Sequence, residues 1–494
     1  KLSLMNSIRL RRHAISIVPQ SRRVLLRPFI PAEMSRIRTM MERVFVRSEE
    51  SVGEELAKVW QDFEFRHRNL GAVLLENYER VQKQVPWAAP VSDQRKLLLG
   101  ALFSGEYALE SAAIFNPSIV AHPDQRGVAP GAVRFVMSLR ATGEGHISSI
   151  EFRTGMIDAG GNISMDSVSP YVSAAEIVAN PSFQKRQFQM KLLELGLLQE
   201  DAQAVLAPLG DIFSLAELTQ IMAQVRQKTE PKTHDFRRAL DCIQWLADSN
   251  YEQHFPETLA FSERIVFPFS PNETNGIEDA RFVRFREDDG SVMYYATYTA
   301  YNGRSILPQL IETLDFAKFR ILTLSGARVQ NKGMALFPRR VGGRYAMLSR
   351  FDDENLFLMY SQSPYEWTDP QLILRPSAMW ESVKIGNCGS PIETDAGWLV
   401  LTHGVGPMRK YCIGAVLLDR EDPTQVIGRL HEPLLAPEGA DREGYVPNVV
   451  YSCGSMVHGR ELILPFAVSD LASTIISVSL DELLAKLTCG ASAR

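Results

Sequence analysis

Two acidic residues and an arginine form the clearest chemical signal in the chain, in the segment 276–281 (Gly-Ile-Glu-Asp-Ala-Arg). This segment follows a loop rich in proline, asparagine and glycine, 268–276, and precedes an apolar run typical of a β-strand. A carboxyl group at such a junction can face a pocket while the strand holds its backbone in place. A carboxylic acid held in this way can donate a proton to a leaving group. Glu278 and Asp279 are therefore candidate acids, although an exposed acidic pair beside Arg281 would give the same pattern.

The elements that must position these residues alternate between helical and β patterns. Apolar residues recur at a spacing near 3.6 over 31–110 and again over 173–253, which predicts helices in both segments. Ser51, with a glutamate three residues later, has the form of a capping box and predicts a helix start. Short runs rich in Val, Ile, Tyr, Phe and Leu lie between turn residues over 111–155 and 258–479, which predicts strands.

The longer β stretch predicts a propeller. It is too long for a simple sandwich, and its apolar runs recur as the blades of a propeller do. No literal repeat accompanies these runs, so their spacing alone supports this architecture. The expected organisation is an N-terminal strand with a helical extension over 1–110, a first blade over 111–160, a helical insertion over 161–255, the remaining blades over 256–480 and a C-terminal tail over 481–494.

Composition and charge exclude several classes of partner. The chain has 494 residues and a net charge of -5, so it lacks the basic surface of a nucleic-acid-binding protein or a polybasic membrane anchor. No run approaches the ~20 apolar residues that a membrane-spanning helix needs. The five cysteines are scattered and lack C-x-x-C spacing. Their distribution favours reduced thiols in the cytoplasm over a disulfide framework or a zinc site, and we expect no metal.

Motifs in both β stretches resemble those of glycoside hydrolase family 130, the mannoside phosphorylases and mannosidases. The segment 276–281 resembles the family's G-x-E-D-P-R acid motif, with Ala280 where proline is usual. The resemblance implies a mainly β fold, a five-bladed β-propeller with additional N-terminal and inserted α-helical segments that lie outside the family pattern. The other matching motifs are, in chain order, Phe115-Asn116-Pro117, Leu139-Arg140, Tyr298-Thr299-Ala300-Tyr301-Asn302-Gly303, Leu336-Phe337-Pro338, Arg350, Lys384-Ile385-Gly386, His403-Gly404-Val405, Val446-Pro447-Asn448 and Ser469-Asp470.

The same resemblance implies the chemistry of the acid. Asp279 occupies the position of the family's general acid, whose proton passes through a hydroxyl of the mannosyl unit. The usual inverting hydrolase instead places an acid and a base on either side of the bond. A phosphorolytic enzyme needs no general base, because phosphate is already an anionic nucleophile. It needs a cationic pocket that holds phosphate in line with the anomeric carbon. Inorganic phosphate is then a co-substrate, and no cofactor is expected.

A basic set at five positions matches the phosphate pocket that the resemblance implies. Lys332 stands where arginine often occurs, so it keeps the charge but loses the bidentate fork. Each member also has an ordinary structural explanation, for example a surface ion pair of Arg350 with the neighbouring Asp352 and Asp353. Hydrolytic members lose much of this basic set, so its retention favours a phosphorylase. The five positions are Lys332, Arg350, Lys384, His403 and Tyr411.

Further positions match residues that contact the mannosyl ring in the family. Polar groups suit vicinal hydroxyls, and tyrosine rings suit the apolar face of a sugar. Arg281 is expected to orient Asp279 or its loop, and Glu278 to act as the structural acid of that loop. The expected sugar contacts are Asn116, Arg140, Tyr298, Tyr301 and Asp470.

Three functions remain open at this point. The leading hypothesis is an inverting glycoside phosphorylase that cleaves a β-mannoside with inorganic phosphate to give α-mannose 1-phosphate, and also runs in reverse. An exo-acting β-mannosidase would need a general base, for which Glu381 is the candidate. A non-catalytic carbohydrate-binding propeller is the third hypothesis, because a fold alone does not guarantee chemistry. The expected partners are a β-mannoside oligosaccharide and phosphate, with the helical segments offering surfaces for a homo-oligomer; the linkage, β-1,2 or β-1,4, stays open.

Overall fold

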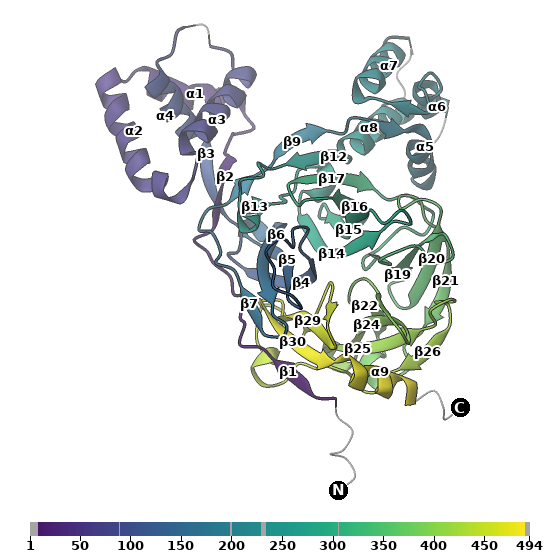
Figure 1. Cartoon of the computed structure of the whole chain (residues 1–494). Helices are drawn as coiled ribbons and strands as arrows, with labels where there is room; N and C mark the ends of the chain where they lie inside the picture. Colours follow the sequence, from purple (N-terminus) through teal and green to yellow (C-terminus); the bar gives the residue numbers. More distant parts are fainter. Residues whose placement is uncertain (1–7, 88, 198–199, 229–233, 305, 490–494) are drawn as a thin grey trace.

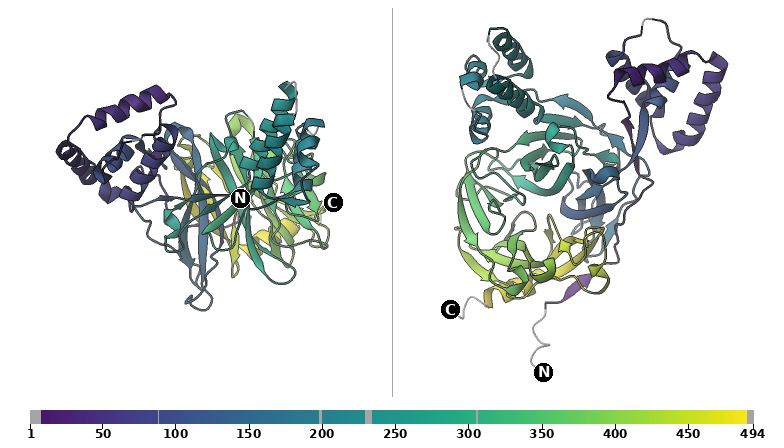
Figure 2. Two further views of the ribbon diagram at one scale, coloured as in Figure 1. Left: turned by 90° about the horizontal axis from the view of Figure 1, so that it is seen from above. Right: turned by 180° about the vertical axis from the view of Figure 1, so that it is seen from behind.

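The protein is mainly β, with two separate groups of helices at its periphery (Figure 1). The computed structural model describes residues 8–87, 89–197, 200–228, 234–304 and 306–489. Figure 2 shows that the two helical groups stand apart from each other, with the sheets between them. Within the described residues, no helix is long and apolar enough to cross a membrane.

The first helical group, called here the helical extension, consists of amphipathic helices. Ile37 on the first helix and Leu99 on the last are fully buried in their shared core. The second helix begins three residues before the expected start, because the Ser48 hydroxyl, and not that of Ser51, caps it by accepting from the Ser51 backbone N–H at 3.2 Å. The helices are α1 (Met34–Phe45), α2 (Glu49–Phe63), α3 (Leu70–Gln84) and α4 (Asp93–Leu102).

The strands fall into successive antiparallel groups arranged around a common centre (Figure 1). The first and second groups are joined by one parallel pairing, between Gly276 and Ser148. The first group contains β4 (Ala113–Ala121), β5 (Val133–Thr142), β6 (Ser148–Ile157) and β7 (Ile163–Met165). The second contains β14 (Gly276–Arg286), β15 (Val292–Tyr301), β16 (Ile306–Thr313), β17 (Lys318–Thr323), β12 (Tyr251–His254) and β9 (Glu176–Ala179).

The remaining strand groups follow in chain order, except for one strand from the beginning of the chain. That strand, β1 (Leu10–Arg12), pairs with β30 and so completes the fifth group. The third group is β18 (Ala335–Leu336), β19 (Tyr345–Ser349), β20 (Leu356–Ser361) and β21 (Thr368–Leu374). The fourth is β22 (Lys384–Asn387), β23 (Ile392–Thr394), β24 (Gly397–Val405), β25 (Tyr411–Leu418) and β26 (Val426–Arg429). The fifth is β1 with β27 (Val450–Tyr451), β28 (Met456–His458), β29 (Glu461–Val468) and β30 (Ala472–Ser479).

The second helical group, the helical insertion, has its own apolar core around Leu192, Phe213 and Ile243. Its flanking strands β9 and β12 pair with each other, and β12 also pairs with β17. The insertion is therefore tied to the second strand group at both ends. Its helices are α5 (Lys185–Glu194), α6 (Glu200–Leu206), α7 (Leu215–Lys228) and α8 (His234–Asp248).

Short paired strands and a last helix complete the fold. The segment expected to be a tail forms α9 (Leu480–Cys489), whose Leu483 and Leu487 are buried in the core of the fourth and fifth groups. The short pairs are β2 (Val24–Pro28) with β3 (Ser104–Ala108), β8 (Ser173–Ala174) with β13 (Arg264–Ile265), and β10 (Phe183–Gln184) with β11 (Ile212–Phe213).

A buried network of four charges joins the beginning of the chain to the first strand group. The Arg23 guanidinium contacts the carboxylates of Glu110 and Glu151, each at 2.7 Å. Arg153 contacts the same two carboxylates at 2.7 and 3.1 Å. Each arginine thus contacts both carboxyl groups, and these contacts offset the loss of hydration of the buried groups. The network fixes the strand β2 and, through it, the position of the helical extension.

Candidate active site

Asn116 and Asp279 lie at interruptions of two neighbouring strands. The strand pairing shifts between Phe115 and Ser118 in β4, and again just after Glu278 in β14. Both residues have left-handed backbones, with φ of 50° and 56°. A bulge of this kind re-aims a side chain, and few residues other than glycine adopt such angles. The two side chains meet as a result: Asn116 Nδ2 donates to Asp279 Oδ1 at 2.6 Å.

Arg140 and Lys332 surround the acidic pair with positive charge. Arg140 Nη2 donates to Glu278 Oε1 at 2.8 Å, and its Nη1 lies 3.5 Å from Asp279 Oδ1. Lys332 Nζ contacts the other carboxylate oxygen of Glu278. Glu278 is thus the residue that holds both cations beside Asp279. The Oδ1 of Asn116 is buried without a partner and offers an acceptor to a ligand hydroxyl.

The charge state of Asp279 follows from these neighbours. Burial alone would raise its pKa, but the positive charges of Arg140, Arg281 and Lys332 and the hydrogen bond from Asn116 outweigh burial and hold the pKa below its usual value. Asp279 is therefore a carboxylate in the ligand-free protein. It must take up a proton before it can act as a general acid. A negatively charged ligand nearby would favour that protonation.

Asp470 carries a second carboxyl group, whose charge interacts with that of Asp279. It lies in the turn between β29 and β30, with φ of 50°. Burial, followed by the negative charge of Asp279, raises the pKa of Asp470 to about 6, although Arg140 and Arg409 act in the opposite direction. The two carboxyls therefore differ, because Asp470 keeps its proton to a higher pH than Asp279.

Arg281 connects the acid to the rest of the site. This arginine is 2% exposed, and its Nη1 donates to the backbone carbonyl of Asp279 at 3.0 Å. Its Nη2 donates to the Tyr451 hydroxyl at 2.6 Å. The Tyr451 ring in turn lies 4.9 Å from the His403 ring, centroid to centroid. Arg281 thus holds the backbone at the bulge, as the sequence predicts, and also bridges the acid and the basic set.

His403 acts as a hydrogen-bond acceptor for Arg350. Its Nδ1 lies 3.0 Å from the Asn387 carbonyl oxygen, which only accepts, so Nδ1 carries the proton. Its Nε2 then accepts from Arg350 Nη1 at 3.1 Å. Burial, followed by the charges of Arg350 and Arg281, holds the pKa of His403 well below its usual value. The neutral imidazole therefore positions Arg350 in the ligand-free protein.

Asp353 bridges two cations of the basic set. Its Oδ1 lies 3.2 Å from Arg350 Nη2, and its Oδ2 accepts from Lys384 Nζ at 2.8 Å. The Asp353 side chain is about half exposed, whereas Arg350 is buried. The Tyr411 ring stacks 6.2 Å from that of His403. Arg350, Lys384, His403 and Tyr411 thus gather in one place, whereas Lys332 lies on the side of Glu278.

The two tyrosines expected at the sugar differ in their surroundings. Tyr298 is 3% exposed in the core of the second strand group, and its hydroxyl bonds to Glu273 at 2.5 Å and to Gln309 at 2.8 Å. Its ring therefore leaves almost no surface for a sugar in this structure. Tyr301 ends β15 opposite Gly276 and is half-buried.

Glu381, the candidate base of a hydrolase, serves a structural turn. It is 1% exposed, and its Oε1 accepts from the backbone N–H groups of Ser377 and Ala378 at 2.9 and 3.0 Å. The same oxygen also forms an ion pair with Arg429. These partners all hold Oε1 in the turn, whereas Oε2 is buried without a hydrogen-bond partner.

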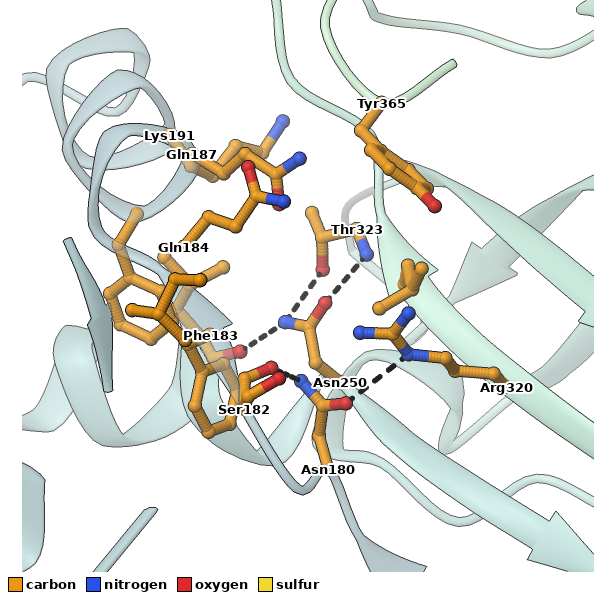
Figure 3. Close-up of a pocket in the computed structure, with 14 residues that line it drawn as sticks. Asn180, Ser182, Phe183, Gln184, Gln187, Lys191, Asn250, Arg320, Thr323 and Tyr365 are labelled. Carbon is orange, nitrogen blue, oxygen red and sulfur yellow. Dashed lines mark hydrogen bonds between the residues drawn. The ribbon is translucent and has the colours of Figure 1, made fainter. Parts of the chain in front are cut away.

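A small enclosed pocket lies away from these residues, between the helical insertion and β17 (Figure 3). Its volume is about 100 Å³, and its wall combines apolar side chains with several amides. Asn250 donates to the Leu246 carbonyl at 2.7 Å and accepts from the Thr323 N–H at 2.9 Å, so its polar atoms already have partners. These hydrogen bonds of Asn250 therefore join the helical insertion to the strand β17. Elsewhere in the described residues, no group of three or more His, Cys, Asp or Glu side chains is arranged to hold a metal ion.

Comparison with known proteins identifies the family. The family model for glycoside hydrolase family 130, described as beta-1,4-mannooligosaccharide phosphorylase, matches residues 247–488. The 1,2-beta-oligomannan phosphorylase of Thermoanaerobacter sp. is 35% identical over 232 residues, which are 44% of this chain and 74% of that protein. The chain belongs to glycoside hydrolase family 130. The beta-1,2-mannobiose phosphorylase of Listeria innocua is 29% identical over 271 residues, which are 53% of this chain and 73% of the relative.

One solved structure also aligns with the chain. The Listeria innocua beta-1,2-mannobiose phosphorylase in complex with beta-1,2-mannobiose aligns with 76% of this chain and 92% of its own, with 21% identity and a TM-score of 0.46. The match to the family 130 model includes Asp279, the basic set and Asp470, but begins after Asn116 and Arg140. The structure nevertheless brings both of these earlier residues to Asp279.

Tyr451 and Asp353 are site residues to which the sequence analysis assigned no role in the site. Tyr451 is 170 residues from Arg281, its hydrogen-bond partner, so no local pattern links the two. The available signal is its place directly after the family 130 motif at 446–450. Asp353 was noted only as a surface ion-pair partner of Arg350, and its second contact, with Lys384, appears only in three dimensions.

Proposed function

We propose that this member of glycoside hydrolase family 130 is an inverting glycoside phosphorylase. It cleaves a β-mannoside with inorganic phosphate to give α-mannose 1-phosphate, and it catalyses the reverse synthesis. The observation that carries the proposal is the unbroken path of contacts from Asp279 through Arg281, Tyr451 and His403 to Arg350. This path supports a single site that combines a buried acid with a cationic cluster. The names of the relatives, all mannoside phosphorylases, agree with it.

Phosphate binds at Arg350 and Lys384 in this proposal, with His403 and Tyr411 beside them. In the ligand-free protein the Asp353 carboxylate occupies the place between the two cations. A phosphate oxygen pair can replace that carboxylate, because arginine and lysine bind both anions with charge-assisted hydrogen bonds. Lys332 lies beside Glu278 and adds positive charge near the reacting sugar.

The chemical step then couples the nucleophile to the acid. A phosphate oxygen forms a bond to the anomeric carbon as the bond to the glycosidic oxygen breaks on the opposite face, which converts the β-linkage into an α-phosphate. The departing oxygen receives the proton that Asp279 supplies through a sugar hydroxyl. Phosphate brings negative charge into the site and so raises the pKa of Asp279, which lets the acid become protonated once phosphate is bound.

We also propose that the five strand groups are the blades of a five-bladed β-propeller. Contacts between the fifth and first groups support closure of the ring. The Cys453 N–H donates to the Pro117 carbonyl at 2.8 Å, and the Ile114 N–H to the Leu471 carbonyl at 3.0 Å. Closure would bring Asn116, Asp279 and Asp470, from three of the groups, to the same end of the central axis.

Reverse-direction activity tests the proposed reaction. The protein is incubated with α-mannose 1-phosphate and a panel of acceptors (mannose, glucose, N-acetylglucosamine and mannobioses), and phosphate release is followed. We expect release that requires both an acceptor and Asp279, and that is abolished in Asp279→Asn. The linkage of the product then gives the specificity, β-1,2 or β-1,4. Cleavage of β-mannobioses without phosphate would instead establish a hydrolase, and activity in neither direction would favour a binding protein.

A further inference from the structure

A second cleft, of about 730 Å³, lies between the helical extension and the strands that precede Asp279. One wall is the start of α3 with the residues before it, including Arg68 and Asn69. The opposite wall includes Gln253 on β12 and the loop with Phe267 and Phe269. Because one wall of the cleft belongs to the helical extension, which lies outside the family match, this cleft is a feature of this chain's own architecture.

The cations in the wall of this cleft already have partners. Arg68 contacts the Glu263 carboxylate through two nitrogens, at 2.8 and 2.5 Å. His67 lies 2.8 Å from the Glu106 carboxylate, and Arg80 pairs with Glu76 at 2.5 Å. Arg27, which also lines the cleft, stacks its guanidinium on the rings of Tyr107 and Phe267, at 5.2 and 4.6 Å. A wall whose charges are paired in this way suits a neutral ligand better than an anion.

Amides and an aromatic ring supply the unused binding groups. Asn69 stands at the start of α3, yet its side chain makes no capping hydrogen bond. Gln253 is 1% exposed and donates from Nε2 to the Phe267 carbonyl at 2.8 Å, whereas its Oε1 is buried without a partner. Phe269 is 55% exposed beside the Tyr251 ring, 5.2 Å away. Amide donors and acceptors beside an open aromatic face match the hydroxyls and the apolar face of a sugar.

The loop in the wall is fixed to the segment that carries the acid. The backbone N–H groups of Phe269 and Ser270 donate to Glu273 Oε2 at 3.0 and 2.9 Å. The Tyr298 hydroxyl, from the strand paired with β14, bonds to the other oxygen of Glu273. Phe269 is therefore held in a defined position relative to Asp279, which follows ten residues later in the chain.

We propose that this cleft binds the distal part of a neutral oligosaccharide whose reacting end lies at Asp279. The identity of the sugar, a β-mannoside, rests on the proposed function. The volume of the cleft falls within the range of about 300–1,000 Å³ that is usual for ligand sites. Binding energy gained there would favour chains longer than a disaccharide, so the helical extension sets the preference for chain length.

Calorimetric binding measurements on the full chain test this proposal. The Asp279→Asn variant is titrated with β-1,2- and β-1,4-linked mannobiose and with the corresponding mannohexaoses, so that no ligand is consumed. We expect one mannohexaose to bind more tightly than its disaccharide. Adding Phe269→Ala weakens mannohexaose binding about tenfold, because an aromatic contact is lost. Adding Asn69→Ala weakens it about fivefold through a lost hydrogen bond and leaves the helix cap intact.

Phe65→Ala is the matched control, because Phe65 is an exposed phenylalanine of the helical extension (68% exposed) that does not line the cleft. It should leave the mannohexaose affinity as it is in Asp279→Asn. Equal affinities for the two chain lengths, or equal effects of Phe269→Ala and Phe65→Ala, would overturn the proposal. The proposed function has its own test, and it is contradicted if the parent protein releases no phosphate with any acceptor. The calorimetric result still tests the cleft in that case.

Discussion

At the scale of single residues, Asp470 brings a negative charge that opposes the cations around Asp279. Burial raises the pKa of Asp470 to about 6, with the charge of Asp279 as the next cause, and the effect of two charges on each other is mutual. Above that pH Asp470 is negative and makes ionisation of Asp279 less favourable. The acid of the proposed mechanism thus depends on a second carboxyl that is distant in the sequence.

Asp470→Asn should move the alkaline limb of the pH profile to lower pH. The amide removes a negative charge next to Asp279, so the pKa of Asp279 falls further and the acid loses its proton at a lower pH. The measurement is kcat/KM for phosphorolysis of a mannobiose between about pH 5 and pH 9. The variant should also have a lower kcat/KM at its optimal pH because a sugar contact is lost. That loss lowers the whole profile and does not shift the pH of its alkaline limb. An unshifted limb would show that Asp470 does not influence the acid.

The residues of the site differ in how far the sequence predicted them. Separate motifs predicted Asn116 and Arg140 as sugar contacts, and the structure places both side chains beside Asp279. Tyr298 was expected at the sugar, but the alternation of β15 turns its ring into the core. No sequence motif indicated a role for Tyr451, because its contact with Arg281 joins residues that are far apart in the chain. A motif shows which residue types are present, whereas bulges and tertiary packing determine which way each side chain points.

At the scale of elements, close strand pairing makes room for the basic set. Gly386 on β22 pairs with His403 on β24. A Cβ atom at Gly386 would lie 2.5 Å from His403 Cε1 and 3.3 Å from Arg350 Cδ. The absence of a side chain at this position therefore allows the imidazole and the guanidinium to lie against the strand.

Gly386→Ala should weaken phosphate binding. The added methyl group displaces His403 and the guanidinium that it positions, so we expect the KM for phosphate to rise about tenfold. Steady-state phosphorolysis at varied phosphate gives this KM, and a thermal unfolding curve shows that the variant is folded. Gly53→Ala is the control, since a Cβ there meets only the end of the Gln94 side chain, at 3.4 Å. A phosphate KM equal to that of the parent would contradict the assigned role of Gly386.

Element types were easier to predict than element boundaries. The 3.6-residue pattern predicts the helices of the extension, and the structure shows α1 to α4 there. The predicted start of α2 was wrong by three residues, because Ser48 and Ser51 both precede a suitable pattern and Ser48, with its extended backbone, is the cap. The helix α9 was not predicted, because its apolar residues stabilise a helix only when they pack against the strands that they cover.

At the scale of the whole molecule, contacts between distant parts of the chain lie beyond the reach of sequence patterns. The pairing of β1 with β30 joins the beginning of the chain to its last strand group. The network of Arg23, Glu110, Glu151 and Arg153 joins the same region to the first group. Each residue of this network looks like an ordinary charged residue in the sequence. Only folding buries the four together and gives their charges a structural role.

This network should make the stability of the protein depend on pH. Burial, followed by the charge of Glu151, raises the pKa of Glu110 to about 7, so the folded state holds a proton that the unfolded state releases above about 4.5. The stabilisation is complete below the unfolded pKa and is lost as the pH rises through 7. The pKa of Glu151 lies below its usual value, so Glu151 stays ionised in both states over this interval and adds no slope.

Glu110→Gln should therefore flatten the pH dependence of thermal unfolding. The parent protein should lose a few degrees in Tm between about pH 5 and pH 8, whereas the amide, which resembles the protonated acid, removes this part of the loss. Scanning calorimetry at both pH values provides the comparison. Glu55→Gln is the control, because Glu55 is a surface carboxyl whose pKa lies below its usual value and which stays ionised throughout the interval. An equal fall in Tm for Glu110→Gln and the parent would mean that Glu110 does not hold the proton, and that the two arginines are balanced by two ionised carboxylates.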